Sequence, residues 1–341
     1  MALFGGARQR REYAAQIAAT THWLAGAVLP PPGHRRVLVL GPKGGASKTT
    51  TIASLGLVLS QLRGEVVAVA DMNPDDGTLR DRLVPAQYPP STRQLVDLLA
   101  DPGQLDTFAD LSEFSELAGK LRVLTNVDAD PAAAAAGDVE AHTAVLVRLA
   151  RVVNLLLIDS GTSLVSPVVT ANLNHADHLV VASSHDPVVV HKTFRGLEYL
   201  ASHGREDMVR RATVVCSVSD AAADVETLRG ELVKFAHPQS PARTSGQILV
   251  PYDPALSSRG GGLIRWDALA PATQLAYLQL AVQMMHSFLP PQPVAPEPSA
   301  PPLPPYPAGP VPAAPALPAA APPVPVLVDA SGPGWDDGWP V

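Results

Sequence analysis

The chain has 341 residues, 46% of them hydrophobic, which is enough for one large domain or two ordinary domains with a substantial core. The 25 basic and 32 acidic residues give a formal charge of −7, so no global charge draws the protein to nucleic acid or to anionic lipid. The single cysteine, Cys216, excludes a disulfide framework and a cysteine-based metal cluster, and it fits a reducing compartment. We therefore expect a cytoplasmic protein.

The sequence carries no apolar run near the roughly 18–20 residues that a membrane span requires. The basic residues Arg8, Arg10 and Arg11 are followed by polar residues, among them Glu12 and Gln16, which is a poor pattern for a signal peptide. We expect neither a transmembrane segment nor secretion by a leader.

A helical extension is predicted at the N-terminus, over residues 1–33. Tyr13, Ile17, Leu24 and Val28 recur at spacings that place them on one face of a helix, and Pro30–Pro32 should end it. Such a helix could pack on the protein's own core, bind a partner protein, or lie on a membrane surface behind its basic start. The sequence leaves these three possibilities open.

The main domain is predicted over residues 34–289, where short β-branched runs alternate with helical patterns. The predicted strands are 37–40, 66–70, 121–124, 155–158, 179–182, 213–216 and 248–250. Helices are indicated after the first strand, by Ile52, Leu55 and Leu59, and over about 271–288. This alternation predicts an α/β fold with a doubly wound, mostly parallel sheet, in which ligands bind at the carboxyl ends of the strands.

A candidate phosphate-binding loop follows the first strand directly. Its residues are Gly41, Pro42, Lys43, Gly44, Gly45, Ala46, Ser47, Lys48, Thr49 and Thr50. Glycines let backbone N–H groups converge on phosphate oxygens, and the helix N-terminus behind the loop favours an anion. Lys48 should reach the β- and γ-phosphates, and the Thr49 hydroxyl should ligate Mg²⁺.

The run Lys43-Gly44-Gly45-x-x-Lys48-Thr49 resembles the deviant Walker A motif of the ParA/MinD ATPases. The resemblance implies an ATPase that binds ATP and Mg²⁺ and closes as a homodimer over the nucleotide. In that arrangement Lys43 reaches the nucleotide held by the other subunit, and Lys48 serves its own. Ser47 departs from the pattern, because most members have glycine there.

The loop after the second strand contains Asp71-Met72-Asn73-Pro74-Asp75-Asp76-Gly77-Thr78-Leu79 and is predicted to be a switch beside the γ-phosphate. Asp71 resembles the first residue of the family's switch I. Asn73 stands where the family usually has a second aspartate, which positions the attacking water. An amide can orient a water but cannot take its proton, so we expect slow hydrolysis. Asp71 and Asp75 are the nearby carboxylates that could compensate.

The buried run that ends at Ile158 leads into Asp159-Ser160-Gly161-Thr162, which resembles a Walker B and switch II motif. A carboxylate at Asp159 can hold Mg²⁺ through water, and Gly161 leaves room for the backbone to bond the γ-phosphate. We expect Asp159 and the phosphate loop to lie at neighbouring strand ends of one sheet.

Two further stretches refine the resemblance. Pro251-Tyr252-Asp253-Pro254 lies where relatives contact the adenine ring, so Pro251 and Asp253 are predicted adenine contacts. Together with the Asp71–Leu79 pattern it resembles the EspI-like ATPases that accompany type VII secretion systems. This branch also carries asparagine at the position of Asn73.

The C-terminal residues 290–341 hold 19 of the 36 prolines, interleaved with alanine and valine. Each proline fixes φ and removes a donor, so this segment is predicted to be a disordered, proline-rich tail that serves as a linker or a docking ligand. Trp335 and Trp339 near its end could belong to a docking motif.

The functional hypothesis is an ATP-dependent dimerising switch that controls the assembly or position of a partner complex. The partner would bind the N-terminal helix or the proline-rich tail. One alternative makes DNA the cargo, for which Arg205, Arg210 and Arg211 are the clustered basic residues. A second is a scaffold that binds ATP without significant turnover, and a third is a membrane switch of the MinD kind.

Overall fold

The computed structural model describes residues 2–29, 33–42, 46–73, 78–126, 139–256 and 262–289. The chain divides into one unit of Met1–Leu289 with Gly334–Val341 and a second unit of Pro290–Pro333. Every described residue belongs to the first unit. The predicted disordered tail and its two tryptophans therefore lie outside the described residues.

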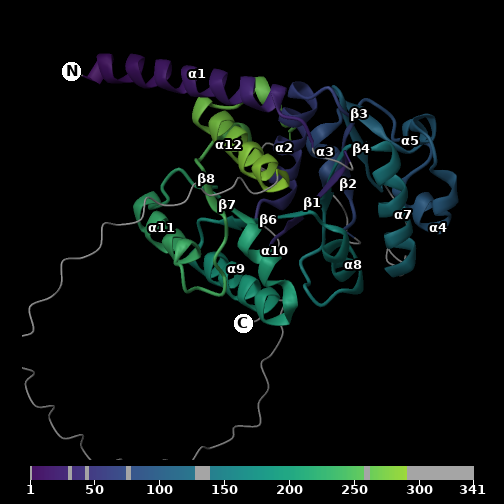
Figure 1. Ribbon diagram of the computed structural model, residues 1–341. Helices are drawn as coiled ribbons and strands as arrows, with labels where there is room; N and C mark the ends of the chain where they lie inside the picture. Colours follow the sequence, from purple (N-terminus) through teal and green to yellow (C-terminus); the bar gives the residue numbers. More distant parts are fainter. Residues whose placement is uncertain are drawn as a thin grey trace, which may run out of the picture. The chain divides into compact units, whose positions relative to one another are not determined.

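A single eight-stranded sheet organises the first unit, in the order β3-β4-β2-β5-β1-β6-β7-β8 (Figure 1). The strands are β1 (Arg35–Leu40), β2 (Val67–Asp71), β3 (Glu116–Ala118), β4 (Leu121–Leu124), β5 (Leu155–Asp159), β6 (His178–Ser184), β7 (Thr213–Ser217) and β8 (Gly246–Val250). All neighbouring pairs are parallel except β3 with β4. The predicted doubly wound, mostly parallel sheet is confirmed, and each of the seven predicted strands is present.

The edge strand β3 is the one strand that the sequence pattern did not reveal. It is three residues long and forms a tight hairpin with β4, in which Ala118 pairs with Leu121. Gly119 in the turn has a φ of +65°, a conformation that glycine adopts without steric cost. Its short length and mixed composition give no period-two signal, so only the turn could have indicated it.

Helices cover both faces of the sheet (Figure 1). They are α1 (Ala2–Gly26), α2 (Lys48–Leu62), α3 (Leu79–Leu83), α4 (Leu95–Ala100), α5 (Phe108–Phe114), α7 (Val139–Val152), α8 (Pro167–His175), α9 (Pro187–Leu200), α10 (Glu206–Arg211), α11 (Val225–Leu232) and α12 (Pro271–Phe288). Alternation along β1 sends Val37 and Val39 into a core with α2 and α12, whereas Leu38 and Leu40 enter a second core under α7 and α9.

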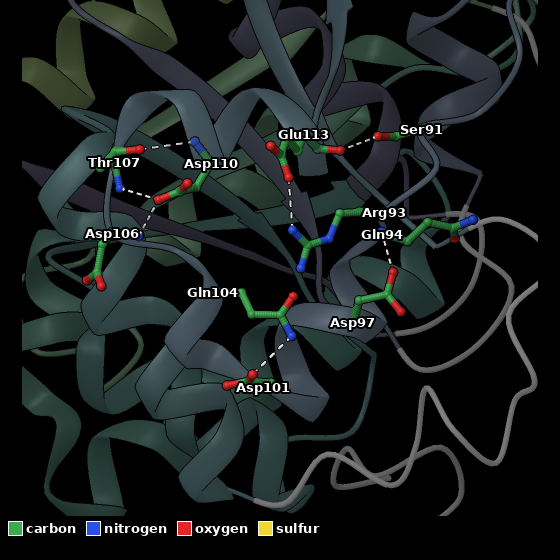
Figure 2. Close-up of polar contacts among 10 residues, drawn as sticks. All are labelled: Ser91, Arg93, Gln94, Asp97, Asp101, Gln104, Asp106, Thr107, Asp110 and Glu113. Carbon is green, nitrogen blue, oxygen red and sulfur yellow. Dashed lines mark hydrogen bonds and ion pairs between the residues drawn. The ribbon is translucent and has the colours of Figure 1, made fainter.

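The acidic segment around α4 and α5 is explained by local structure (Figure 2). Asp110 and Asp97 accept backbone hydrogen bonds at the starts of α5 and α4, from Thr107 N and Gln94 N, both at 2.7 Å. Glu113 pairs with Arg93 at 2.9 Å. These carboxylates cap helices and close the segment, so their abundance needs no metal or ligand to account for it.

Helix α1 packs with its C-terminal end on α12. Leu24 is fully buried in the core shared with α12, and the Trp23 ring stacks on His286 with centroids 4.6 Å apart. Arg63 Nη1 donates to the Leu24 carbonyl at 3.1 Å. The predicted N-terminal helix is present, but it ends at Gly26, so the prediction for Val28 was wrong: this residue lies beyond the helix and is 76% exposed.

We expect Leu24→Ala to lower the free energy of unfolding by about 2–5 kcal/mol, because it leaves a cavity between α1 and the body of the domain. Urea denaturation followed by circular dichroism measures the change. Gln16→Ala, at an exposed position of the same helix, is the matched control and should change the stability by less than about 0.5 kcal/mol. Equal stability of the two variants would show that α1 does not share the core.

Candidate functional site

The phosphate loop begins where β1 ends. Gly41 is buried, and a Cβ added there would lie 2.8 Å from Lys48 Cγ and 3.1 Å from the Ala182 carbonyl oxygen. A side chain at position 41 would clash with Lys48, so glycine is needed where the Lys48 side chain passes over the backbone of the loop. Ala46 is buried against the same turn, and the half-buried Thr49 and Thr50 belong to the first turn of α2. Lys43, Gly44 and Gly45 lie outside the described residues.

Ser47 holds the position immediately before α2 in a left-handed conformation, with φ 62° and ψ 26°. It is the one non-glycine residue with positive φ among the described residues. Its carbonyl accepts the first helical hydrogen bond, from Thr51 N at 2.9 Å. The left-handed backbone costs an L-residue roughly 1–2 kcal/mol, which gives a physical reason for the glycine usual at this position of the resembled motif.

We expect Ser47→Gly to leave the stability unchanged or raise it by up to about 1 kcal/mol, because relief of the strained backbone outweighs the added freedom of the unfolded chain. Ser47→Val should lower it by about 1–2 kcal/mol, since a β-branched residue tolerates positive φ poorly. Thermal unfolding of the three proteins gives the order. A valine variant as stable as the glycine variant would contradict the left-handed conformation.

Thr49 and Asp159 meet at the carboxyl ends of neighbouring strands. Strands β1 and β5 pair in parallel, which confirms the predicted adjacency of the phosphate loop and Asp159. The Thr49 hydroxyl donates to Asp159 Oδ2 at 2.9 Å, across 110 positions of sequence. Gly161, half-buried, follows at the start of the next loop.

Two buried carboxylates stand side by side at this sheet edge. Asp71, the last residue of β2, is the register partner of Asp159 on β5, and the two residues are 4% and 3% exposed. Burial raises the pKa of Asp71 to about 7, and the charge of Asp159 adds to the rise. Burial also raises the pKa of Asp159 to about 6, against the hydrogen bond from Thr49 and the charge of Lys48. A cation placed here would stabilise the ionised forms.

The oxygens of Thr49 and Asp159 suit Mg²⁺. Asp159 Oδ1 is buried and has no hydrogen-bond partner among the described residues. Mg²⁺ typically takes one or two protein oxygens, completing its shell with phosphates and water. The Thr49 hydroxyl and the Asp159 carboxylate supply such oxygens, so the residues present fit the ion. The described residues contain no group of three His, Cys, Asp or Glu side chains that could bind a metal without a ligand.

Asp71 closes the predicted switch loop. Its carboxylate accepts hydrogen bonds from Asn73 N, at 3.2 Å, and from the backbone of Leu79, so it holds both ends of the loop. Met72 N donates to the Asp159 carbonyl at 2.9 Å, which links the loop to β5. The sequence pattern did not predict this closure. Asp75 and the rest of 74–77 lie outside the described residues.

The helix that follows the switch loop is fixed at two points. Arg80 Nε donates to Glu116 Oε2 on β3 at 2.9 Å, and both side chains are nearly buried. Arg82 Nη2 donates to the Leu256 carbonyl at 2.8 Å. These bonds fix helix α3, so the C-terminal end of the switch loop joins a rigid element. Sequence reasoning missed both arginines, because nothing in the local pattern distinguishes them from exposed helix cations.

Asp253 has a role in the fold. Its two carboxylate oxygens accept hydrogen bonds from Ala255 N at 3.0 Å and from Ala270 N, the residue before α12, at 2.8 Å, and the side chain is 5% exposed. These contacts favour a structural role over the predicted adenine contact. Pro251, the other predicted contact, lies at the wall of a cavity beside the ends of β7 and β8.

The chain is similar to known proteins in sequence and in fold. No family model matches the chain. The chain is 28% identical over 259 residues to the ESX-1 secretion-associated protein EspI of Mycobacterium tuberculosis, strains CDC 1551/Oshkosh and ATCC 25618/H37Rv, a match over 76% of this chain. The matched region spans 37% of the length of EspI.

The fold is similar to a ParA family ATPase from Chlorobium tepidum, with a TM-score of 0.58, 16% identity and coverage of 73% of this chain and 98% of that one. It is also similar to the septum site-determining protein MinD of Pyrococcus horikoshii complexed with Mg-ADP, with a TM-score of 0.53, 16% identity and coverage of 74% and 96%. The sheet of this chain and its sequence match to EspI point to the same kind of fold. The chain is a ParA/MinD-like protein by fold and is related to EspI.

Proposed function

We propose that this protein is a nucleotide switch that binds ATP with Mg²⁺, dimerises in the bound form and hydrolyses ATP slowly. One observation carries the proposal: the hydrogen-bonded Thr49–Asp159 pair, with one buried carboxylate oxygen lacking a described partner, lies at the strand ends directly behind the phosphate loop. A P-loop fold with this pair is suited to a nucleoside triphosphate and its cation. The likeness in fold to MinD complexed with Mg-ADP supports an adenine nucleotide with Mg²⁺ as the class of ligand.

Each residue has a proposed task. The backbone of Gly44–Thr50 would bind the phosphates, Lys48 would neutralise the β- and γ-phosphate oxygens, and Thr49 with Asp159 would hold Mg²⁺, which offsets the charge that develops on the transferred phosphoryl group. Asp71 would keep the switch loop closed, and Asn73 would orient the attacking water. Because an amide accepts no proton, turnover would be slow.

The dimer and its output are also proposed. Lys43 would reach the nucleotide of the second subunit, and the change in the switch loop would be read by a protein partner through α1 or the proline-rich tail. The similarity to EspI suggests type VII secretion as the setting, and the single cysteine fits a cytoplasmic location. None of the helices in the described ranges is both long and apolar enough to cross a membrane.

The structure gives DNA binding little support. Arg205 donates to the Leu173 carbonyl at 3.2 Å, and Arg210 pairs with Glu206. Both arginines precede β7 and so lie at the amino edge of the sheet, opposite the phosphate loop. Two of the three candidate arginines thus already have partners within the protein, whereas DNA contact needs a cluster of available basic side chains. The proposed cargo is therefore a protein complex.

Two measurements test the proposal. Sedimentation of wild type and Lys43→Ala with ATP and Mg²⁺ should show a dimer only for wild type. Phosphate release should be slow but above the Lys48→Ala blank. A dimer without phosphate release would favour the scaffold without turnover, and a wild-type protein that stays monomeric with saturating ATP would refute the sandwich dimer.

A further inference from the structure

A cavity of about 280 Å³ opens at the same edge of the sheet as the phosphate loop. Its volume far exceeds the roughly 10–15 Å³ that one water molecule requires. It is bounded by residues after β7, the end of β8 and the residues that follow it, the first turns of α12, two residues of α11 and one of α1. The polar and aromatic members of this wall are Asp220, Arg229, Gln279, Tyr252 and Tyr13.

The direction of a bound nucleotide follows from the sheet order. The carboxylates Asp159 and Asp71 lie on β5 and β2, to one side of β1. The charged end of a triphosphate, with its cation, belongs on that side, so its nucleoside should extend to the other side, across β6 toward β7 and β8. Neighbouring strands are about 4.8 Å apart, which puts the cavity on the order of 10–14 Å from the end of β1. An extended nucleotide can cover that span.

The walls of the cavity suit a planar base. Apolar contact comes from Val218, Pro251 and Leu275, and hydrogen-bonding groups come from Asp220 and Gln279. A few polar groups on an apolar surface are typical of pockets for small molecules. The aromatic ring of Tyr13 is half-buried on this wall, although it belongs to α1, more than 200 positions before the other lining residues.

From this arrangement we propose that α1 is part of the nucleotide site: Tyr13 packs against the base, and nucleotide binding is thereby coupled to the seating of α1 on α12. The proposal rests on the proposed function. The C-terminal end of α1 is anchored by Leu24 and Trp23, whereas residues 8–12 are exposed. In Figure 1 the N-terminal part of α1 projects beyond α12. Tyr13 lies between the two parts, so a base against it would extend the anchored region toward the N-terminus.

Calorimetric titration with two probes tests this. Tyr13→Ala should weaken binding of Mg-ATP about tenfold, because stacking of an aromatic ring on a base is lost. It should leave binding of magnesium tripolyphosphate, which has no base, within about twofold of wild type. Tyr13→Phe should bind both probes as wild type does. Tyr88→Ala, at a 56% exposed tyrosine just beyond α3, is the matched control and should change neither.

The outcomes separate this inference from the proposed function. Equal weakening of both probes by Tyr13→Ala, or weakening of neither, would overturn the role of Tyr13. A wild-type protein that binds neither probe would refute the phosphate site itself. Hydrogen exchange supplies an independent readout: Mg-ATP should slow exchange in residues 8–20 of wild type, and tripolyphosphate should not. Unchanged exchange with saturating ATP would contradict the coupling to α1.

Discussion

Lys48→Ala is expected to weaken ATP binding roughly hundredfold, because the ammonium group supplies charge-assisted hydrogen bonds worth about 1.5–3 kcal/mol each to phosphate oxygens. The structure places this side chain beside the two buried carboxylates of the proposed site. Its stem passes over Gly41, and its charge lowers the pKa of both Asp71 and Asp159, so it lies near the end of the site where Mg²⁺ is proposed to bind. Calorimetry with Mg-ATP measures the affinity directly.

Lys48→Ala should also change the protonation of the two neighbouring carboxylates. Without the Lys48 charge, the pKa values of Asp71 and Asp159 should rise further, because that charge opposes the effect of burial. Lys120→Ala, in the exposed β3–β4 turn, is the matched control and should bind ATP as wild type does. Similar ATP affinities for the two variants would remove Lys48 from the phosphate site.

The sheet could be predicted because its strands are buried on both faces. Runs such as 155–158 are continuously apolar, and the loops between strands and helices carry glycine or aspartate, which together fix the class of fold. The neighbourhood of Thr49 and Asp159 could also be predicted, since both follow strands of one parallel sheet. These predictions need only local patterns and one topological rule.

The remaining features depend on tertiary contacts. Nothing in the sequence around Asp71 indicates that it pairs in register with Asp159 or accepts the Leu79 backbone, because both relations arise from strand order and loop closure. Serine itself gives no signal for the left-handed conformation at position 47, which only the glycine usual at that position of the resembled motif could have indicated. Tyr13 was predicted to lie on a helix face, but what that face meets is decided by the position of α12.

The buried carboxylate pair leads to the second large effect, on stability in the absence of nucleotide. The pKa values of Asp71 and Asp159 are raised to about 7 and about 6, whereas in the unfolded chain both are near the ordinary value of 3.8. Between these limits the native state binds more protons than the unfolded state. The free energy of unfolding should therefore fall as the pH rises from about 4 to about 7.

Asp71→Asn removes one of these titrations and should flatten that fall. Above pH 7, where wild type must keep two charged carboxylates together, the variant should be more stable by about 2–4 kcal/mol; near pH 4 the two proteins should be alike. The asparagine oxygen can still accept the bond from Asn73 N, so the loop retains one tie. Urea unfolding at pH 5 and pH 8 gives the comparison, with Asp207→Asn, exposed on α10, as the control.

Mg-ATP should reverse the order of the two stabilities at pH 8, because a bound cation stabilises the charged pair that wild type supplies and the variant lacks. Parallel pH dependences of wild type and Asp71→Asn would mean that the two carboxylates do not share the site.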